Sequence, residues 1–272
     1  MSDLKVDQKT MSRRNFFSKA GILTAGLVAT GAVGLSGIAN ADTATSSTGT
    51  SPLILPLKYN KLDVEAAYKL GYDGYYKSAC CYGAAYALLT LLHESAPDAG
   101  WNLIPPGMFT YGQGGGLGWG TLCGALNSSL SILNMASKDY SNLGGELLGW
   151  YTQFSFPSNK HEGYCTIKNQ VTTVADSPLC HISVSKWSAA AGGKGNNSGI
   201  NQAGKKERCA KVTGDVAAKT AELLNKALDG TFAASYKTPD TYASCMHCHN
   251  GKDSMRDDEQ GKMDCNSCHT NL

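Results

Sequence analysis

Two C-x-x-C-H motifs near the end of the chain constrain its fold more than any other feature. They are Cys245–His249 and Cys265–His269. This spacing attaches c-type haem, because the two thiols add to the porphyrin vinyl groups and the following histidine ligates the iron. The rival interpretation, a Cys/His zinc site, does not explain a histidine directly after both pairs. We therefore predict two haem c groups, held by Cys245, Cys248, Cys265 and Cys268, with His249 and His269 as proximal iron ligands.

The other four histidines provide candidates for the distal position of each iron. His181 beside Cys180 is the first choice, and His161 and His247 are further candidates. His247 cannot easily turn onto the haem of its own motif, so it would reach a haem in a partner subunit. His93, near the predicted end of a helix, fits a structural role better. A six-coordinate iron has no open position for a substrate, which favours electron transfer over catalysis.

The N-terminus is typical of an export signal. Arg13 and Arg14 form a twin-arginine signature, a Gly/Ala-rich stretch covers 20–38, and the small-residue site 39–41 predicts cleavage. We expect a periplasmic protein with no membrane span once the signal is removed. The net positive charge of residues 1–41 is larger than the net charge of the whole chain, which is +2, so the mature chain is slightly acidic. Nucleic acid is therefore not an expected partner.

Six cysteines remain outside the haem motifs. Twin-arginine export carries proteins that are already folded, often around a cofactor, whereas haem c is attached after export. A cysteine-ligated iron–sulfur cluster is therefore predicted, with disulfides or a zinc site as alternatives. Cys123 is the best single ligand, because it follows a glycine-dense run at a helix start. The other candidate ligands are Cys80 or Cys81, Cys165 and Cys180, while Cys209 is expected to be a buried, inert thiol.

The apolar periodicity predicts a mainly α protein with few strands. Expected helices cover 63–70, 77–94, 121–136, 143–154 and 205–228, and 189–204 is expected to be a loop. The resulting organisation has four parts: a twin-arginine signal peptide (1–41), a flexible lead-in (42–52), a helical cysteine-containing domain with Gly-rich loops (53–204), and a helix followed by a small dihaem segment with little regular structure (205–272).

These features together resemble the split-Soret cytochromes c, part of a wider family named for scattered Cys and Gly-Cys-Ala elements. The resemblance rests on the twin-arginine leader, the Cys80-Cys81 helix, the segment from Gly114 to Leu126, and the C-terminal motif pair. It implies a homodimer with two bis-histidine haems per subunit, in which each iron takes one histidine from the partner chain. It also implies a cysteine-bound iron centre in the N-terminal domain.

The preferred function is electron transfer in the periplasm among two haems and a cysteine-ligated iron–sulfur centre, with other periplasmic redox proteins as partners. One alternative is a haem-based reductase of a small nitrogen or sulfur compound, which needs an open iron position. The other is a redox-sensing dimer whose cysteines form disulfides. The sequence favours a carrier over an enzyme, because it indicates no substrate pocket.

Overall fold

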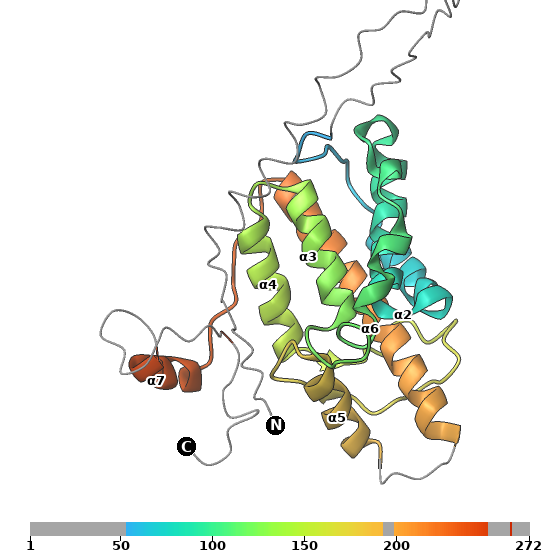
Figure 1. The fold of residues 1–272 in the computed structure, drawn as a ribbon, viewed down its shortest axis with the longest axis vertical. Helices are drawn as coiled ribbons and strands as arrows, with labels where there is room; N and C mark the ends of the chain where they lie inside the picture. The colour runs from blue at the N-terminus through green and yellow to red at the C-terminus, as the bar shows by residue number, and fades with distance from the viewer. Residues whose placement is uncertain (1–52, 193–198, 250–261, 263–272) are drawn as a thin grey trace, which may run out of the picture. The chain divides into compact units, whose positions relative to one another are not determined.

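The computed structural model describes residues 53–192, 199–249 and 262. The expected signal peptide and the whole of the expected lead-in lie outside these residues. The predicted mainly α fold is confirmed: the described chain is a set of packed helices with one short two-stranded sheet (Figure 1).

The longest element, α2 (Val64–Ser95), forms where the sequence predicted two helices. The Asp63 side chain caps its start by accepting hydrogen bonds from the amides of Glu65 at 2.9 Å and Ala66 at 3.0 Å. The expected stop at Gly71 is wrong. The helix breaks instead at Ser78 and Ala79, where Ala79 has a φ of 61°. This kink directly precedes the cysteine pair.

Three 3₁₀ helices, two α-helices and two short strands follow α2. The 3₁₀ helices are η1 (Pro97–Ala99), η2 (Trp101–Leu103) and η3 (Pro106–Gly112). The helices α3 (Gly124–Ala136) and α4 (Tyr140–Gln153) lie within about three residues of their predicted bounds. The strands β1 (Ser155–Phe156) and β2 (Thr173–Val174) pair antiparallel, with Ser155 opposite Val174.

The last three helices differ more from expectation. The sequence did not predict α5 (Cys180–Ala190), and α6 (Gly199–Leu228) begins inside the expected loop. Tertiary contacts support this earlier start, since Gln170 Nε2 donates to the Gly204 carbonyl at 2.9 Å and Trp187 lies beside Gly204. A further helix, α7 (Asp240–His249), carries the first haem motif, where little regular structure was expected.

The core lies between α2 and α6, with α3 and α4 packed against them (Figure 1). Two glycines let α2 and α6 approach closely. A Cβ on Gly71 would lie 3.1 Å from Gly214 Cα, and one on Gly214 would lie 2.7 Å from the Tyr68 carbonyl oxygen. The helix 205–228, which the sequence grouped with the haem segment, thus packs within the helical core.

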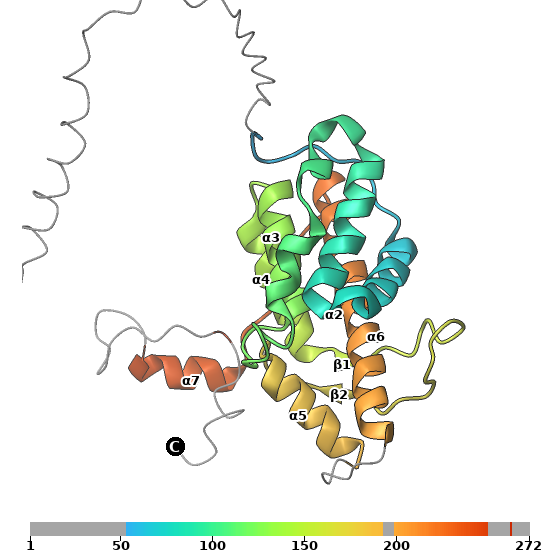
Figure 2. The same cartoon turned by 45° about the vertical axis from the view of Figure 1, so that its right-hand side comes forward.

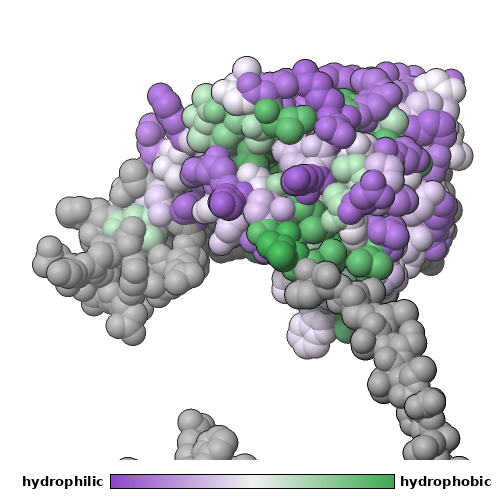
Figure 3. Space-filling view, turned by 90° about the horizontal axis from the view of Figure 1, so that it is seen from above, coloured by the Kyte–Doolittle hydropathy of each residue, from purple (hydrophilic) through white to green (hydrophobic). Residues whose placement is uncertain are grey.

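Figure 2 shows α5 beside the two strands at one end of α6. Figure 3, which looks onto the other end, shows an apolar patch among polar side chains. The described chain begins with three exposed apolar residues, Leu53, Ile54 and Leu55. None of the helices in the described part of the chain is both long and apolar enough to cross a membrane.

The α2–α6 contact predicts opposite effects for two glycine substitutions. Gly214→Ala should lower the melting temperature, because its Cβ meets backbone and overpacking costs about 1–3 kcal/mol. Gly145→Ala on α4 is the control: a Cβ there meets nothing within 4 Å, and the gain in helix propensity is up to about 1 kcal/mol. Thermal unfolding by circular dichroism measures both. Equal stabilisation by the two changes would contradict the close contact.

Candidate metal centre

Four cysteines from four helices gather at one end of the core. Cys80 follows the kink of α2, Cys123 precedes α3, Cys180 begins α5, and Cys209 lies in α6. The pKa of the Cys80 thiol reflects how close the four cysteines lie to one another. Burial raises the pKa of the Cys80 thiol well above its ordinary value, and the charges of the other three cysteines raise it further.

Backbone pairing positions two of these cysteines. Leu122 and Leu179 form an antiparallel bridge. Beside it, the Cys123 amide donates to the Pro178 carbonyl at 3.0 Å, and the Cys180 amide donates to the Thr121 carbonyl at 2.7 Å. The segment before α3 and the segment before α5 are therefore fixed side by side, although 57 positions separate their cysteines.

The glycine-rich loop, residues 112–120, wraps the cysteine group closely. A Cβ on Gly115 would lie 2.9 Å from Cys180 Cβ, and one on Gly112 would overlap Cys81 Sγ. Just beyond the loop, a Cβ on Gly124 would lie 2.6 Å from Cys80 Sγ. Glycine at these positions lets the loop backbone approach the cysteines of α2 and α5 closely.

A buried arginine supplies positive charge to the group. Arg208 is 2% exposed, and its Nη2 donates to Ser183 Oγ at 2.6 Å. Burial alone would lower the pKa of Arg208, but the charges of Cys209, Tyr151 and Cys123 raise it. Burial raises the pKa of Cys123, and Arg208 opposes that rise. The guanidinium therefore favours negative charge on these sulfurs.

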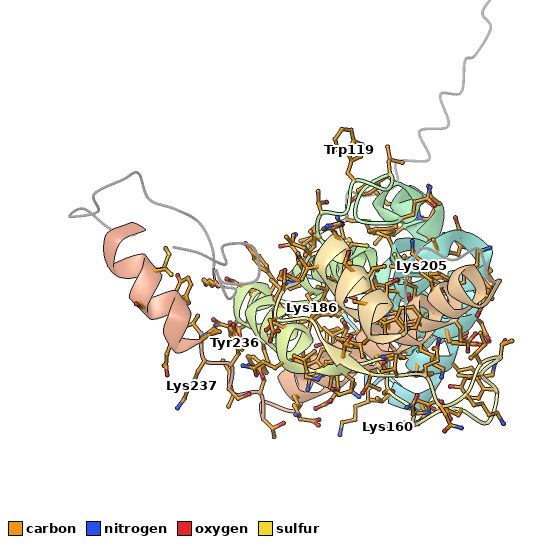
Figure 4. The ribbon with its side chains drawn as sticks, turned by 90° about the horizontal axis from the view of Figure 1, so that it is seen from below. Trp119, Lys160, Lys186, Lys205, Tyr236 and Lys237 are labelled. Carbon is orange, nitrogen blue, oxygen red and sulfur yellow. The ribbon has the colours of Figure 1, made fainter. Side chains whose placement is uncertain are left out.

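Three of the four cysteines line an open cavity of about 430 Å³. Cys80, Cys180 and Cys209 form part of its wall, while Cys123 is buried. The other lining side chains include Tyr75, Gln113, His181 and Lys205. Figure 4 shows Lys205 on α6 and, apart from the body of the molecule, Trp119, which is 85% exposed.

Cysteine thiolates are the ligands of iron–sulfur clusters, and this group of cysteines would offer such ligands. A single zinc or iron ion needs its ligands to converge on one point, with sulfurs about 2.3 Å from the metal. Among the described residues, no three His, Cys, Asp or Glu side chains converge in that way. A cluster is wider and holds its thiolates apart around several irons. Four neighbouring thiols, three of them on the wall of one cavity, and a glycine-rich loop against them would fit such a group.

The structure brings some of the predicted cysteines together and keeps others apart. Cys80, Cys123 and Cys180 come together, whereas Cys81 is absent from the cavity wall and lies against Gly112 and Ser128. Cys165 does not join the group. Its Sγ contacts the His161 carbonyl oxygen at 3.2 Å, in a separate cluster with Tyr68 and Tyr72.

Cys209 takes the place in the group that the sequence assigned to Cys165. The expectation of an inert thiol was based on its position within a helix. In the sequence, two charged residues, Glu207 and Arg208, directly precede Cys209. The structure shows that both are buried. Charged side chains on the packed face of a helix are costly unless they have partners there, so they indicate a functional surface.

The three described histidines occupy different surroundings. His181 is exposed and lines the cysteine cavity, and its amide donates to the Gly120 carbonyl at 3.0 Å. His161 stacks on Tyr68 at 3.9 Å between ring centroids, and its Nδ1 lies 3.2 Å from a Glu65 oxygen. His93 lies in the last turn of α2, and its buried Nδ1 has no partner among the described residues.

The haem-attachment residues are described only in part. Cys245 and the backbone of residues 247–249 belong to α7. The side chains of His247, Cys248 and His249, and all of Cys265, Cys268 and His269, lie outside the described residues. The segment before α7 is fastened to α4 by Glu146, whose carboxylate accepts from the amides of Ser235 at 2.7 Å and Tyr236 at 2.8 Å.

Comparison with known proteins agrees with this geometry. A family model described as "Putative redox-active protein (C_GCAxxG_C_C)" matches residues 78–223, which include all four cysteines of the group. The chain belongs to this redox-active family. A curated relative, the split-Soret cytochrome c of Desulfovibrio desulfuricans, is 33% identical over 221 residues, covering 78% of this chain and 77% of the relative.

A solved structure also resembles the chain. It is described as showing a novel iron centre in the split-Soret cytochrome c from Desulfovibrio desulfuricans. It is 32% identical with a TM-score of 0.69, covering 79% of this chain and 90% of that chain. The expected resemblance to the split-Soret cytochromes c is confirmed.

The thiol pKa values predict how iron uptake depends on pH. Burial raises the pKa of Cys180 to about 12, and the charges of Cys123 and Cys209 add to the rise, so the thiol is protonated at neutral pH without metal. Each thiol must lose its proton to ligate iron, so uptake should increase as pH rises. The measurement is iron bound after chelation and reconstitution with iron and sulfide over a pH series. Uptake that falls with rising pH would contradict these pKa shifts.

Proposed function

We propose that this protein transfers electrons among two covalently attached haem c groups and an iron–sulfur centre held by Cys80, Cys123, Cys180 and Cys209. The observation that carries the proposal is that these four cysteines, far apart in the sequence, lie close enough to affect the pKa of Cys80, and that three of them line one cavity. All the described cysteines are free, which leaves their sulfurs available as ligands. A relative of 33% identity is a cytochrome c, and an iron centre has been described in its structure.

The C-terminal motifs support the haem part of the proposal. Each supplies two attaching thiols and a proximal histidine. His181, His161 and His247 are the proposed distal ligands, with a partner subunit supplying one histidine to each iron. The side chains of His181 and His161 are described, and of these two His181 is the exposed one. His181 is therefore better placed to reach a partner's haem. His161 would first have to leave Tyr68 and Glu65.

Export by the twin-arginine route and a periplasmic location complete the proposal. The twin-arginine signature supports them, and so does a cysteine site built from segments far apart in the chain. Such a site exists only in the folded protein, so a cluster inserted in the cytoplasm requires folding before export. Homodimer formation and docking of periplasmic redox proteins belong to the same proposal.

Cysteine substitutions test the iron–sulfur part directly. Cys180→Ser and Cys209→Ser should each lose the iron in excess of haem, because each removes one sulfur ligand. Cys165→Ser is the matched control, since Cys165 lies in a separate cluster and serine preserves a donor to the His161 carbonyl. Total iron is measured against haem in each purified holoprotein. Iron equal to haem in the unsubstituted protein would refute the cluster.

Carbon monoxide tests the haem part. If both irons are six-coordinate with histidine, carbon monoxide should leave the spectrum of the reduced holoprotein almost unchanged. The same titration after His181→Ala should give a carbon monoxide adduct if His181 is a distal ligand. A rapid, stoichiometric adduct in the unsubstituted protein would instead favour the reductase alternative.

A further inference from the structure

Helix α6 buries two cations, Arg208 and Lys211, and only one of them has an ion-pair partner among the described residues. The Lys211 side chain is fully buried, and its Nζ lies 3.0 Å from a Glu162 oxygen. Arg208 is 2% exposed, and no carboxylate in the described ranges forms an ion pair with it. A buried charge without a counter-charge is strongly destabilising. The guanidinium of Arg208 therefore calls for an anion.

The contacts of Arg208 lead to the cysteine group. Its Nη2 donates to Ser183 Oγ at 2.6 Å and to the Ser183 carbonyl at 3.3 Å, and its Nη1 lies 3.9 Å from Cys209 Sγ. Its Nε is buried and has no hydrogen-bond partner in the described part of the chain. Ser183 Oγ also accepts from Tyr151 OH at 3.0 Å, and Tyr151 in turn interacts with Cys123. The guanidinium thus lies beside one cysteine and is linked to a second one through neutral hydroxyls.

The other buried acids of α6 have partners of their own. Asp215 and Arg208 attract each other, but the Asp215 carboxylate accepts from the amide of Ser158 at 2.9 Å and from its hydroxyl at 2.5 Å. Glu207 accepts from Tyr72 OH at 2.9 Å. Neither acid forms an ion pair with Arg208. The sulfurs of the cysteine group are the remaining source of negative charge next to the guanidinium.

Cysteine sulfurs carry negative charge when they hold a metal. Each ligates as a thiolate, and an iron–sulfur core carries fewer positive charges than its four thiolates carry negative ones, so the whole centre is anionic. Reduction adds one electron and makes it more negative. We infer that Arg208 is the counter-ion of the four-cysteine centre and raises its reduction potential by stabilising the reduced form. This inference rests on the proposed iron centre. Arg208 stays protonated throughout, as guanidinium groups in proteins do.

Burial makes Arg208 more effective than the other cation at the site. Lys205 lines the cavity but is exposed, so water screens its charge. Arg208 acts through the protein interior, where the same charge has a larger effect. Its influence reaches beyond Cys209: burial raises the pKa of Cys123 and of Cys180, and the charge of Arg208 opposes the rise at both.

A redox titration of the iron-loaded holoprotein, followed by electron paramagnetic resonance, tests the inference. The signal of the reduced cluster can be followed in the presence of the haems, because low-spin ferrous haem is diamagnetic. Arg208→Met should lower the midpoint potential of the cluster, because it removes the charge and keeps a long, unbranched side chain. Arg208→Lys keeps the charge, so its midpoint potential should stay closer to that of the unsubstituted protein. An unchanged potential in Arg208→Met would overturn the inference.

Lys211→Met is the matched control. It also removes a buried cation from α6, but this cation is paired with Glu162 and its charge acts on Cys165, which lies outside the cysteine group. The cluster of this variant should keep its midpoint potential. A shift as large as that of Arg208→Met would mean that any buried charge of α6 has the effect, which would overturn the specific role of Arg208.

Thermal unfolding with and without iron gives a second readout. Removing a buried charge that lacks a partner is often neutral or stabilising, so Arg208→Met should not lower the melting temperature of the chelated, metal-free protein. It should lower that of the iron-loaded protein, in which the charge has its partner. Lys211→Met should lower both, because it leaves Glu162 unpaired. An equal loss in both forms of Arg208→Met would indicate a packing role and contradict the inference.

Iron content separates the remaining outcomes. If Arg208→Met loses the iron in excess of haem while Arg208→Lys retains it, the centre requires the charge, as inferred. Loss of that iron in both variants would indicate a role in shape and overturn the counter-ion. Iron equal to haem in the unsubstituted protein would overturn the proposed iron centre and this inference with it. An unchanged potential in an iron-loaded Arg208→Met protein would overturn the inference alone.

Discussion

The close approach of α2 and α6 is the contact on which the rest of the molecule depends. Gly71 and Gly214 let the two backbones meet with no side chain between them. That approach brings the kinked part of α2 opposite the middle of α6, so that Cys80 and Cys209 both face the same cavity. Larger side chains at the two glycines would push the helices apart. The distances among the four cysteines would then increase, although no cysteine had been changed. Backbone proximity, rather than a local motif, builds this site.

Three consecutive residues of α6 contact three different parts of the structure. Glu207 holds the tyrosines of α2, Arg208 reaches Ser183 of α5, and Cys209 enters the cavity. Consecutive residues on a helix project about 100° apart, so three neighbours can serve three surfaces only where the helix is packed on several sides. This arrangement explains why so many polar side chains of α6 are buried, among them Lys211, Thr213 and Asp215.

The sequence predicted what local patterns determine. The haem motifs, the mainly α fold, α3, α4 and the body of α6 follow from spacing and periodicity. Gly71 misled the prediction, because a glycine that serves a helix–helix contact has the same sequence signature as one that ends a helix. The cysteine group contains no C-x-x-C pair, and its four members are brought together by tertiary packing. Sequence reasoning named Cys123 and Cys180 as candidate ligands, left the choice between Cys80 and Cys81 open, and proposed Cys165, whereas the structure brings Cys209 to the group.

The antiparallel bridge between Leu122 and Leu179 has a consequence for how such a site changes over time. The hydrogen bonds that align Cys123 with Cys180 use only backbone atoms, from Thr121, Cys123, Pro178 and Cys180. Side chains near the bridge can therefore be replaced without shifting the register of the two sulfurs. Of the long segment between the two cysteines, the irregular stretch between β1 and β2 lies outside α3 and α4 and can lengthen, shorten or acquire new surfaces. A lineage could in this way alter what docks beside the centre while the spacing of these two sulfurs stays fixed.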